Sequence, residues 1–121
     1  KIISQLMTLR IYHHPRCSKS RKALSLIKNK TSEFKIVEYL KYPLKFKEIK
    51  LLLSQLSMKP IELVRVKEPI WKTNYKGKKM RDNEIINTLI KHPKLMQRPI
   101  VTKDNKAIIA RTKENLLNLF S

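Results

Sequence analysis

One side chain in this sequence stands out for its chemistry, the thiol of Cys17. The residues Ser18 to Asn29 that follow it place their apolar members at helical spacing, with Ser18 expected to cap the first turn, so a helix is predicted to begin immediately at the cysteine. A thiol at a helix N-terminus meets unpaired backbone N–H groups and the positive end of the helix dipole, and both favour the thiolate. Positive charge is added nearby by Arg16, Lys19 and Arg21. We therefore predict a reactive thiol; the alternative is a buried structural cysteine, a common state of free cysteine.

The residues next to Cys17 limit what this thiol can do alone. Ser18 and Ser20 carry hydroxyl groups that can donate hydrogen bonds to the sulfur. Because position 20 is serine, the chain lacks a CxxC pair, and an oxidised Cys17 must be resolved by an external thiol, for which glutathione is the natural candidate. Arg21 lies four positions after the cysteine, whereas a phosphatase loop of the CxxxxxR type needs a longer spacing. A phosphate loop of that type is therefore not predicted.

Two histidines, His13 and His14, precede the thiol and could be considered as metal ligands. A zinc site needs four donors, and beyond these two histidines and Cys17 no fourth donor lies at a recognisable spacing, since His92 belongs to another motif. We therefore expect no metal site and assign the two histidines structural roles.

The elements that must position this thiol alternate between strands and helices. Strands are expected at Thr8–His13 and Phe34–Leu40, on either side of the first helix, and together the three have the size of a βαβ unit. The later elements are predicted as a helix over Phe46–Leu56, a helix from an Asp82 cap to Pro93, a hairpin of Ile100–Thr102 and Ala107–Ala110, and a last helix capped near Thr112. The predicted order is thus βαβ, a helical insert, ββ and then α.

Composition favours a single globular domain. The chain has 121 residues, of which 41% are apolar and one is glycine, and no apolar run is long enough for a membrane span. A lone cysteine fits a reducing compartment, so we expect a cytoplasmic protein. Lys1–Leu6 is interpreted as an N-terminal extension.

The charge balance is strongly basic, with 28 Lys and Arg against 9 Asp and Glu and a net charge of +19. Nucleic acid is one class of partner that such a charge attracts. The lysines are scattered along the chain, and no zinc-finger spacing, RNP-like strand or Gly-rich RNA-binding loop is present. We therefore interpret the charge as a basic surface coat and predict neither specific nucleic-acid binding nor a membrane partner.

Two separated motifs carry a family resemblance. The segments Ile11–Arg21 (IYHHPRCSKSR) and His92–Val101 (HPKLMQRPIV) resemble the glutaredoxin-coupled arsenate reductase (ArsC) family, and PRCSKSR is most similar to its arsenate-reductase-like, uncharacterised branch. Glu62–Trp71 and Ile108–Glu114 are similar to further segments of the family. The resemblance implies an α/β, thioredoxin-like fold with a four-stranded mixed sheet. It also implies one domain over residues 7–121, with a helical insert at about 44–97.

The resemblance also assigns site residues. Cys17 falls on the nucleophile, and the arginine triad that binds the substrate oxyanion corresponds to Arg65, Arg98 and Arg111. The remaining matches are His13 and Ser20, which tune the thiolate, and Pro99, the cis-proline that faces the cysteine. Planar arginine forks and a helix N-terminus both suit an anion such as arsenate.

The implied activity is reduction of arsenate to arsenite. The thiolate forms a thiol-arsenate adduct, glutathione acts as co-substrate and displaces arsenite, and glutaredoxin regenerates the thiol; no bound cofactor is implied. The sequence departs from the family pattern at His14, where Asn is usual, and at Thr112, where Pro is usual. Two alternatives stay open: a non-enzymatic, Spx-type regulator that binds RNA polymerase, and a glutathione-linked thiol-disulfide reductase with another substrate.

Overall fold

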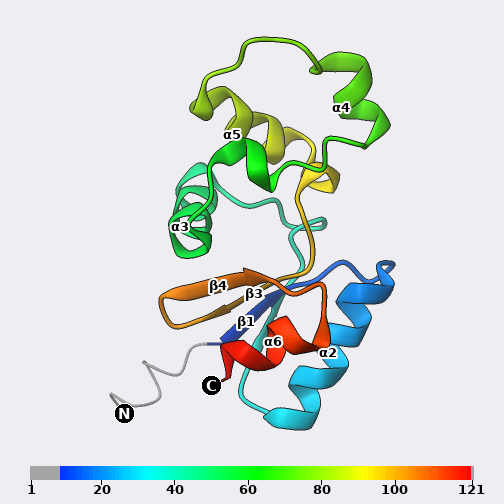
Figure 1. Cartoon of the computed structure of the whole chain (residues 1–121), viewed down its shortest axis with the longest axis vertical. Coiled ribbons are helices and arrows are strands. Elements are labelled where there is room, and N and C mark those ends of the chain that lie inside the picture. The colour runs from blue at the N-terminus through cyan, green and yellow to red at the C-terminus, as the bar shows by residue number, and fades with distance from the viewer. Residues whose placement is uncertain (1–8, 121) are drawn as a thin grey trace.

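The computed structural model describes residues 9–120, in which four strands form one sheet (Figure 1). In chain order the strands are β1 (Leu9–Tyr12), β2 (Lys35–Val37), β3 (Ile100–Lys103) and β4 (Lys106–Ile109). Their order across the sheet is β2-β1-β3-β4; β1 and β2 are parallel, and the other two pairs are antiparallel. The mixed sheet is therefore as predicted. The expected extension Lys1–Leu6 lies outside the described residues.

Helices cover both faces of this sheet (Figure 1). On one face α2 (Ser18–Lys30) and α6 (Lys113–Leu119) close a core that includes Ile11 and Val101. On the other face α3 (Phe46–Leu56) and α5 (Asp82–Lys91) close a second core that includes Tyr12 and Ile100. Successive residues of a strand point to opposite faces, so β1 and β3 each contribute to both cores. Within the described range, no helix is both long and apolar enough to cross a membrane.

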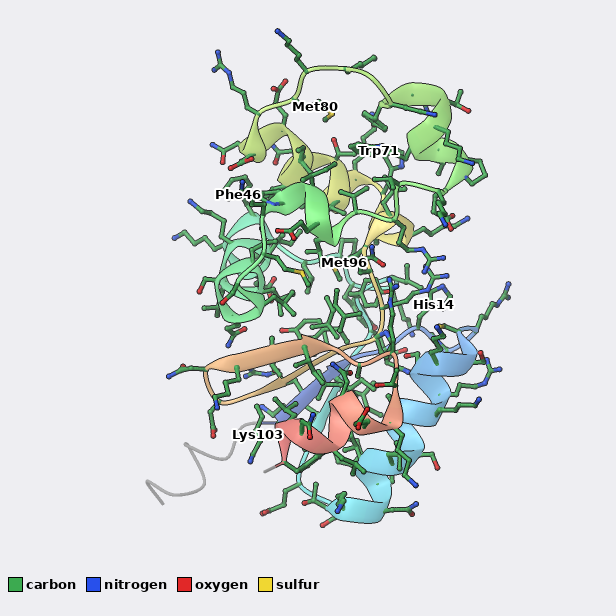
Figure 2. The ribbon with its side chains drawn as sticks, in the orientation of Figure 1. His14, Phe46, Trp71, Met80, Met96 and Lys103 are labelled. Atoms are coloured by element: carbon green, nitrogen blue, oxygen red, sulfur yellow. The ribbon has the colours of Figure 1, made fainter. Side chains whose placement is uncertain are left out.

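Between β2 and β3 the chain forms a largely helical segment. Besides α3 and α5 it contains η1 (Pro60–Leu63), α4 (Pro69–Asn74) and η2 (Pro93–Leu95). The sequence pattern does not predict α4, because only Trp71 of its residues is buried and no apolar period marks it. Trp71 stacks on Tyr75 with 5.4 Å between ring centroids, and it lies in the same half of the molecule as Met96 (Figure 2). Trp71 is thus a packing residue of this helical segment.

Two helix starts differ from the prediction by one residue. Asp82 is the first residue of α5, and the N-cap is Arg81, whose backbone N–H donates to the Glu84 carboxylate at 2.8 Å. The Glu84 carboxylate, in the first turn of the helix, thus accepts a backbone N–H that has no partner within the helix. In α2, Ser18 is likewise the first helical residue, and Cys17 itself is the N-cap. The sulfur therefore occupies the position that serine was expected to take.

The second strand is shorter than predicted, since β2 covers Lys35–Val37 and not Phe34–Leu40. The backbone carbonyl of Glu38 accepts hydrogen bonds from the N–H groups of Lys41 and Tyr42, so the chain turns directly after the strand. The hairpin and the last helix agree with the prediction more closely, with strands β3 and β4 in register and α6 beginning after a Thr112 cap.

Candidate active site

Three strand ends meet at one edge of the sheet. Tyr12 at the end of β1 pairs with Ile100 at the start of β3, which in turn pairs with Ile109 at the end of β4. The segments that continue from these ends carry Cys17, Arg98 and Arg111. The sheet topology therefore brings residues that are distant in sequence to the same edge.

Cys17 is held by the turn that starts α2. Its backbone is extended (φ −91°, ψ 121°), and its N–H donates to the carbonyl of His14 at 3.0 Å. The thiol is half-buried, and burial alone raises its pKa. The backbone N–H of Ser20, the side chain of Arg98 and the backbone N–H of Lys19 outweigh burial, so the pKa of Cys17 is lowered from its ordinary value of 9.0. The arrangement favours the thiolate.

The Ser20 hydroxyl, expected to donate to the sulfur, bonds instead to the turn before Cys17. Its Oγ accepts the backbone N–H of His14 at 2.9 Å and lies 2.7 Å from Nδ1 of His13. Because the oxygen accepts from His14, its own proton is available to His13 Nδ1. Burial lowers the pKa of both histidines, which favours their neutral imidazole forms. His14 lies beside the start of α2 (Figure 2), and Ser20 thus fastens the turn to the helix.

Backbone pairing brings Arg65 and Arg98 together. Val64 and Met96 form an isolated antiparallel bridge. Beside this bridge the N–H of Arg65 donates to the carbonyl of Leu95 at 2.6 Å. Arg98 follows Met96 by two positions, so the two arginines emerge from paired segments.

Pro99 connects Arg98 to the third arginine. The Arg98–Pro99 peptide bond is cis, as the resemblance implied. The carbonyl of Pro99 accepts the backbone N–H of Ala110 at 2.8 Å. This bond holds the end of β4 against the Arg98 segment and places Arg111 at the same edge.

Gln97 belongs to the site although the sequence analysis does not single it out. Its Oε1 accepts a hydrogen bond from Nη2 of Arg111, and its Nε2 donates to the carbonyl of Val64 at 3.2 Å. Its backbone N–H donates to the carbonyl of Leu63 at 2.8 Å. Gln97 therefore ties Arg111 to the segment that carries Arg65. The only sequence signal is its position next to Arg98, because a neutral amide offers no charge pattern to follow.

One cavity of about 460 Å³ collects these groups, and Cys17, Arg65, Arg98 and Arg111 all line it. Glu68 also lines it and forms an ion pair with Arg65 at 3.3 Å. The Nε atoms of Arg65 and Arg98 are buried and have no hydrogen-bond partner among residues 9–120. Buried donors are usually paired, and a guanidinium fork suits an oxyanion. The cavity is therefore chemically suited to a small anion close to a thiol.

The other predicted site residues support this cavity without lining it. His13 lies in the turn before α2, Ser20 in the first turn of α2 and Pro99 in the loop before β3. In the described part of the chain, no three side chains of His, Cys, Asp or Glu gather in a way that could hold a metal ion. The charged chemistry of the site thus comes from one thiol, three guanidinium groups, the Glu68 carboxylate and the two lysine side chains of Lys19 and Lys67.

A tyrosine beneath the site is the second residue that the sequence analysis does not single out. Tyr39 is 1% exposed, and its hydroxyl has no hydrogen-bond partner in the described range. Burial raises the pKa of Tyr39 to about 12, the charge of Arg98 opposes this shift, and Cys17 adds to it. The phenol therefore stays protonated at neutral pH. In the sequence, Tyr39 falls inside the predicted strand Phe34–Leu40, where an aromatic residue is typical of a core position.

The chain is similar to known proteins over almost its whole length. The sequence profile of the ArsC family matches residues 12–119. An Escherichia coli protein named Uncharacterized protein YfgD is 39% identical over 113 residues, which cover 92% of this chain and 95% of that protein. An Arsenate reductase of Neisseria meningitidis is 34% identical over 110 residues, which cover 89% of this chain and 94% of that protein.

The fold agrees with these sequence relationships. A solved structure titled Arsenate reductase from Vibrio cholerae has a TM-score of 0.86 and 33% identity, and the match covers 93% of this chain and 98% of that one. The predicted α/β, thioredoxin-like fold with a four-stranded mixed sheet is confirmed. On the matched profile and on these relatives, the chain belongs to the ArsC family.

Proposed function

We propose that this protein is a glutathione- and glutaredoxin-dependent oxidoreductase that reduces arsenate to arsenite through an adduct on Cys17. One observation carries the proposal: a thiol of lowered pKa and three arginines line the same cavity, where two arginine Nε atoms have no partner among the described residues. Relatives that carry the name arsenate reductase support the choice of substrate. The need for reducing thiols and the single cysteine fit a cytoplasmic setting.

The first step is a condensation without a change of oxidation state. The Cys17 thiolate attacks arsenic, an S–As bond forms and one As–O bond breaks. The departing oxygen takes up two protons and leaves as water. Arg65, Arg98 and Arg111 bind the remaining oxygens and reduce the repulsion between the anionic thiolate and the anionic substrate.

The second step transfers two electrons to arsenic. A glutathione thiolate attacks the sulfur of Cys17, and the electron pair of the breaking S–As bond stays on arsenic, which leaves as arsenite. The product on the protein is a mixed disulfide of Cys17 and glutathione. A glutaredoxin thiolate then attacks the glutathione sulfur and releases Cys17 as the thiolate.

The supporting residues act on the thiol through the backbone. His13 and Ser20 hold the turn that presents Cys17, and Pro99 positions Arg98 against β4. We assign these three residues positioning roles, since they do not line the cavity.

The test is arsenite formation by the purified protein with arsenate, glutathione and glutaredoxin, compared with reactions that omit each component. Cys17→Ser should lower turnover by at least about 10³-fold, because the hydroxyl is not ionised at neutral pH. Arg81→Ala is the control, since Arg81 is an exposed arginine outside the cavity.

Three outcomes would contradict the proposal. Undiminished arsenite formation by Cys17→Ser would exclude the adduct. Reduction of glutathione mixed disulfides by a protein that leaves arsenate unchanged would indicate a thiol-disulfide reductase with another substrate. Retention of RNA polymerase without thiol chemistry at Cys17 would indicate an Spx-type regulator.

A further inference from the structure

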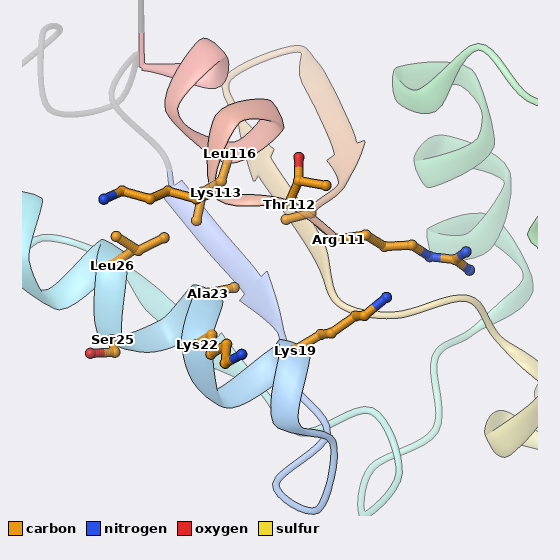
Figure 3. Close-up of a pocket in the computed structure, with 10 residues that line it drawn as sticks. Lys19, Lys22, Ala23, Ser25, Leu26, Arg111, Thr112, Lys113 and Leu116 are labelled. Atoms are coloured by element: carbon orange, nitrogen blue, oxygen red, sulfur yellow. The ribbon is translucent and has the colours of Figure 1, made fainter.

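A second cavity lies between α2 and α6 and adjoins the thiol site. It has a volume of about 360 Å³, and its apolar lining comes from Ala23 and Leu26 on α2, Ala110 after β4 and Leu116 on α6. Figure 3 shows the α2 side chains facing those of α6 across this groove. We call it the α2–α6 groove. Its volume lies at the small end of the range for small-molecule pockets, about 300–1,000 Å³.

The groove is continuous with the site of Cys17. Lys19 and Arg111 line both the α2–α6 groove and the cavity that holds the thiol. Figure 3 shows Lys19 and Arg111 together where α2 begins, and Lys113 farther along the groove. An α-helix rises 1.5 Å per residue, so the groove residues of α2, from position 19 to position 26, begin about 3 Å from Cys17 along the helix axis and end about 14 Å from it.

The charges around the groove are of one sign. Its apolar floor is bordered by Lys19, Lys22, Arg111 and Lys113, and among residues 9–120 no acidic side chain lines it. The cavity at Cys17 differs, because Glu68 is part of its lining. A ligand of the groove should therefore carry negative charge spread along its length, together with some apolar surface.

We propose that the α2–α6 groove seats glutathione, the thiol co-substrate of the proposed reaction, with its thiol at the Cys17 end. The thiol is on the central residue of the tripeptide, so the arm on one side of that cysteine, which ends in a carboxylate, extends along the groove away from Cys17. Lys22 and Lys113 bind a carboxylate of the tripeptide, and the apolar floor takes its methylene groups. In this position the glutathione thiolate approaches Sγ of Cys17 from the helix side while the oxyanion occupies the arginine side.

This inference rests on the proposed function for its chemistry but is tested without arsenate. The probe is S-methylglutathione, whose blocked thiol cannot react, titrated into the full chain while backbone amide NMR shifts are followed. We expect the shifted amides to include those of Ala23, Leu26, Ala110 and Leu116. The same titration gives the Kd.

The variant is the double charge reversal Lys22→Glu/Lys113→Glu, which should raise the Kd about 5- to 20-fold because two exposed ion pairs become repulsive. The matched control is Lys28→Glu/Lys47→Glu, which changes the net charge equally at two exposed lysines outside the groove and should change the Kd less than about twofold. In the arsenate assay, the KM for glutathione should rise with the Kd while the KM for arsenate stays unchanged.

Several results would overturn the assignment. The first is a set of amide shifts confined to the cavity around Cys17. The second is an equal loss of S-methylglutathione binding in the control pair Lys28→Glu/Lys47→Glu. The third is a rise in the KM for glutaredoxin in Lys22→Glu/Lys113→Glu while S-methylglutathione binding is unchanged. The last result would assign the groove to a protein partner. A protein that binds S-methylglutathione in the groove but does not reduce arsenate would refute the proposed function and leave the groove assignment standing.

Discussion

The thiol and the arginines of this site are positioned in different ways. Cys17 sits at the N-cap of α2, and the groups that lower its pKa include the N–H groups of Lys19 and Ser20, two and three residues further on. The arginines come from three segments that meet only in the folded molecule, and each depends on backbone pairing between distant residues. The thiol's position is thus mainly a local property of one turn and one helix, whereas the anion site is a property of the whole fold.

Arg98 acts on both the thiol and the anion site, because it lines the anion cavity and also lowers the pKa of Cys17. Arg65 and Arg111 line the same cavity but are not among the main groups that lower the pKa of the thiol. A change at Arg98 should therefore affect both the thiol and the binding of the oxyanion, and changes elsewhere should affect one of them. The predictions below use this difference.

Arg98→Ala should have the largest effect. Loss of a charged donor at a developing or bound oxyanion costs about 10²- to 10³-fold in turnover, and kcat/KM for arsenate should fall by that amount. Arg98→Lys should restore only part of it, because lysine keeps the charge but lacks the planar fork. Steady-state arsenite formation measures the effect, and equal kcat/KM for Arg98→Ala and Arg81→Ala would separate Arg98 from catalysis.

The alkylation rate of Cys17 should show the lowered pKa directly. The thiolate fraction rises tenfold per pH unit below the pKa and levels off above it, so the midpoint of the rate of reaction with iodoacetamide should lie below pH 9.0, the ordinary pKa of the thiol. The midpoint should move to higher pH in Arg98→Ala and stay in place in Arg111→Ala. A midpoint at or above 9.0 in the wild-type protein would contradict a thiol stabilised as the thiolate.

The same shift has a consequence for stability. The folded pKa of Cys17 is lowered, so ionisation favours the folded state. This contribution to the free energy of unfolding is present above the unfolded pKa and is lost as the pH falls through the folded pKa. Urea unfolding of wild type and Cys17→Ser across that range should show the wild type gaining stability with pH relative to the variant.

Gln97→Ala should have a smaller effect on kcat/KM, and this effect should be confined to the anion site formed by the three arginines. It removes the side chain that accepts from Arg111 and donates to the carbonyl of Val64. Arg111 is exposed and retains its charge, so we expect the KM for arsenate to rise about fivefold, which is about 1 kcal/mol, the net contribution of an ordinary hydrogen bond. The alkylation midpoint of Cys17 should not move, and a shift of that midpoint would show that Gln97 also acts on the thiol.

The sequence predicts the local part of this site well. The apolar spacing after Cys17 and the strand before it place the thiol at a helix start, and the structure agrees to within one residue. The error at Ser18 arises because serine is the usual cap, whereas here the turn closed by the N–H of Cys17 on His14 makes the cysteine the cap. Ser20 was expected at the sulfur, but the buried Nδ1 of His13 competes for its hydroxyl.

The anion site formed by the three arginines cannot be predicted from the local pattern of the sequence. Nothing in the spacing of Arg65, Arg98 and Arg111 indicates that they meet, and only the family resemblance groups them. The bridge between Val64 and Met96 consists of one residue on each side, which leaves no strand-like alternation to detect. The short helix α4 is not predicted for the same reason, because a single buried residue gives no periodic repeat of apolar positions.

Ser20→Ala tests the turn that presents Cys17, because it removes the hydroxyl that holds this turn to α2. It should have the smallest effect on turnover. The variant keeps the backbone N–H that lowers the pKa of Cys17, so the alkylation midpoint should stay at the same pH. The rate of arsenite formation should change less than about twofold, which is less than the net free energy of one hydrogen bond. It leaves His13 Nδ1 and the N–H of His14 without their buried partner, so the free energy of unfolding should fall by about 1–3 kcal/mol in urea titration. Lost turnover with unchanged stability would instead mean that the hydroxyl acts on the thiolate itself, and the turn before α2 would then be part of the chemistry.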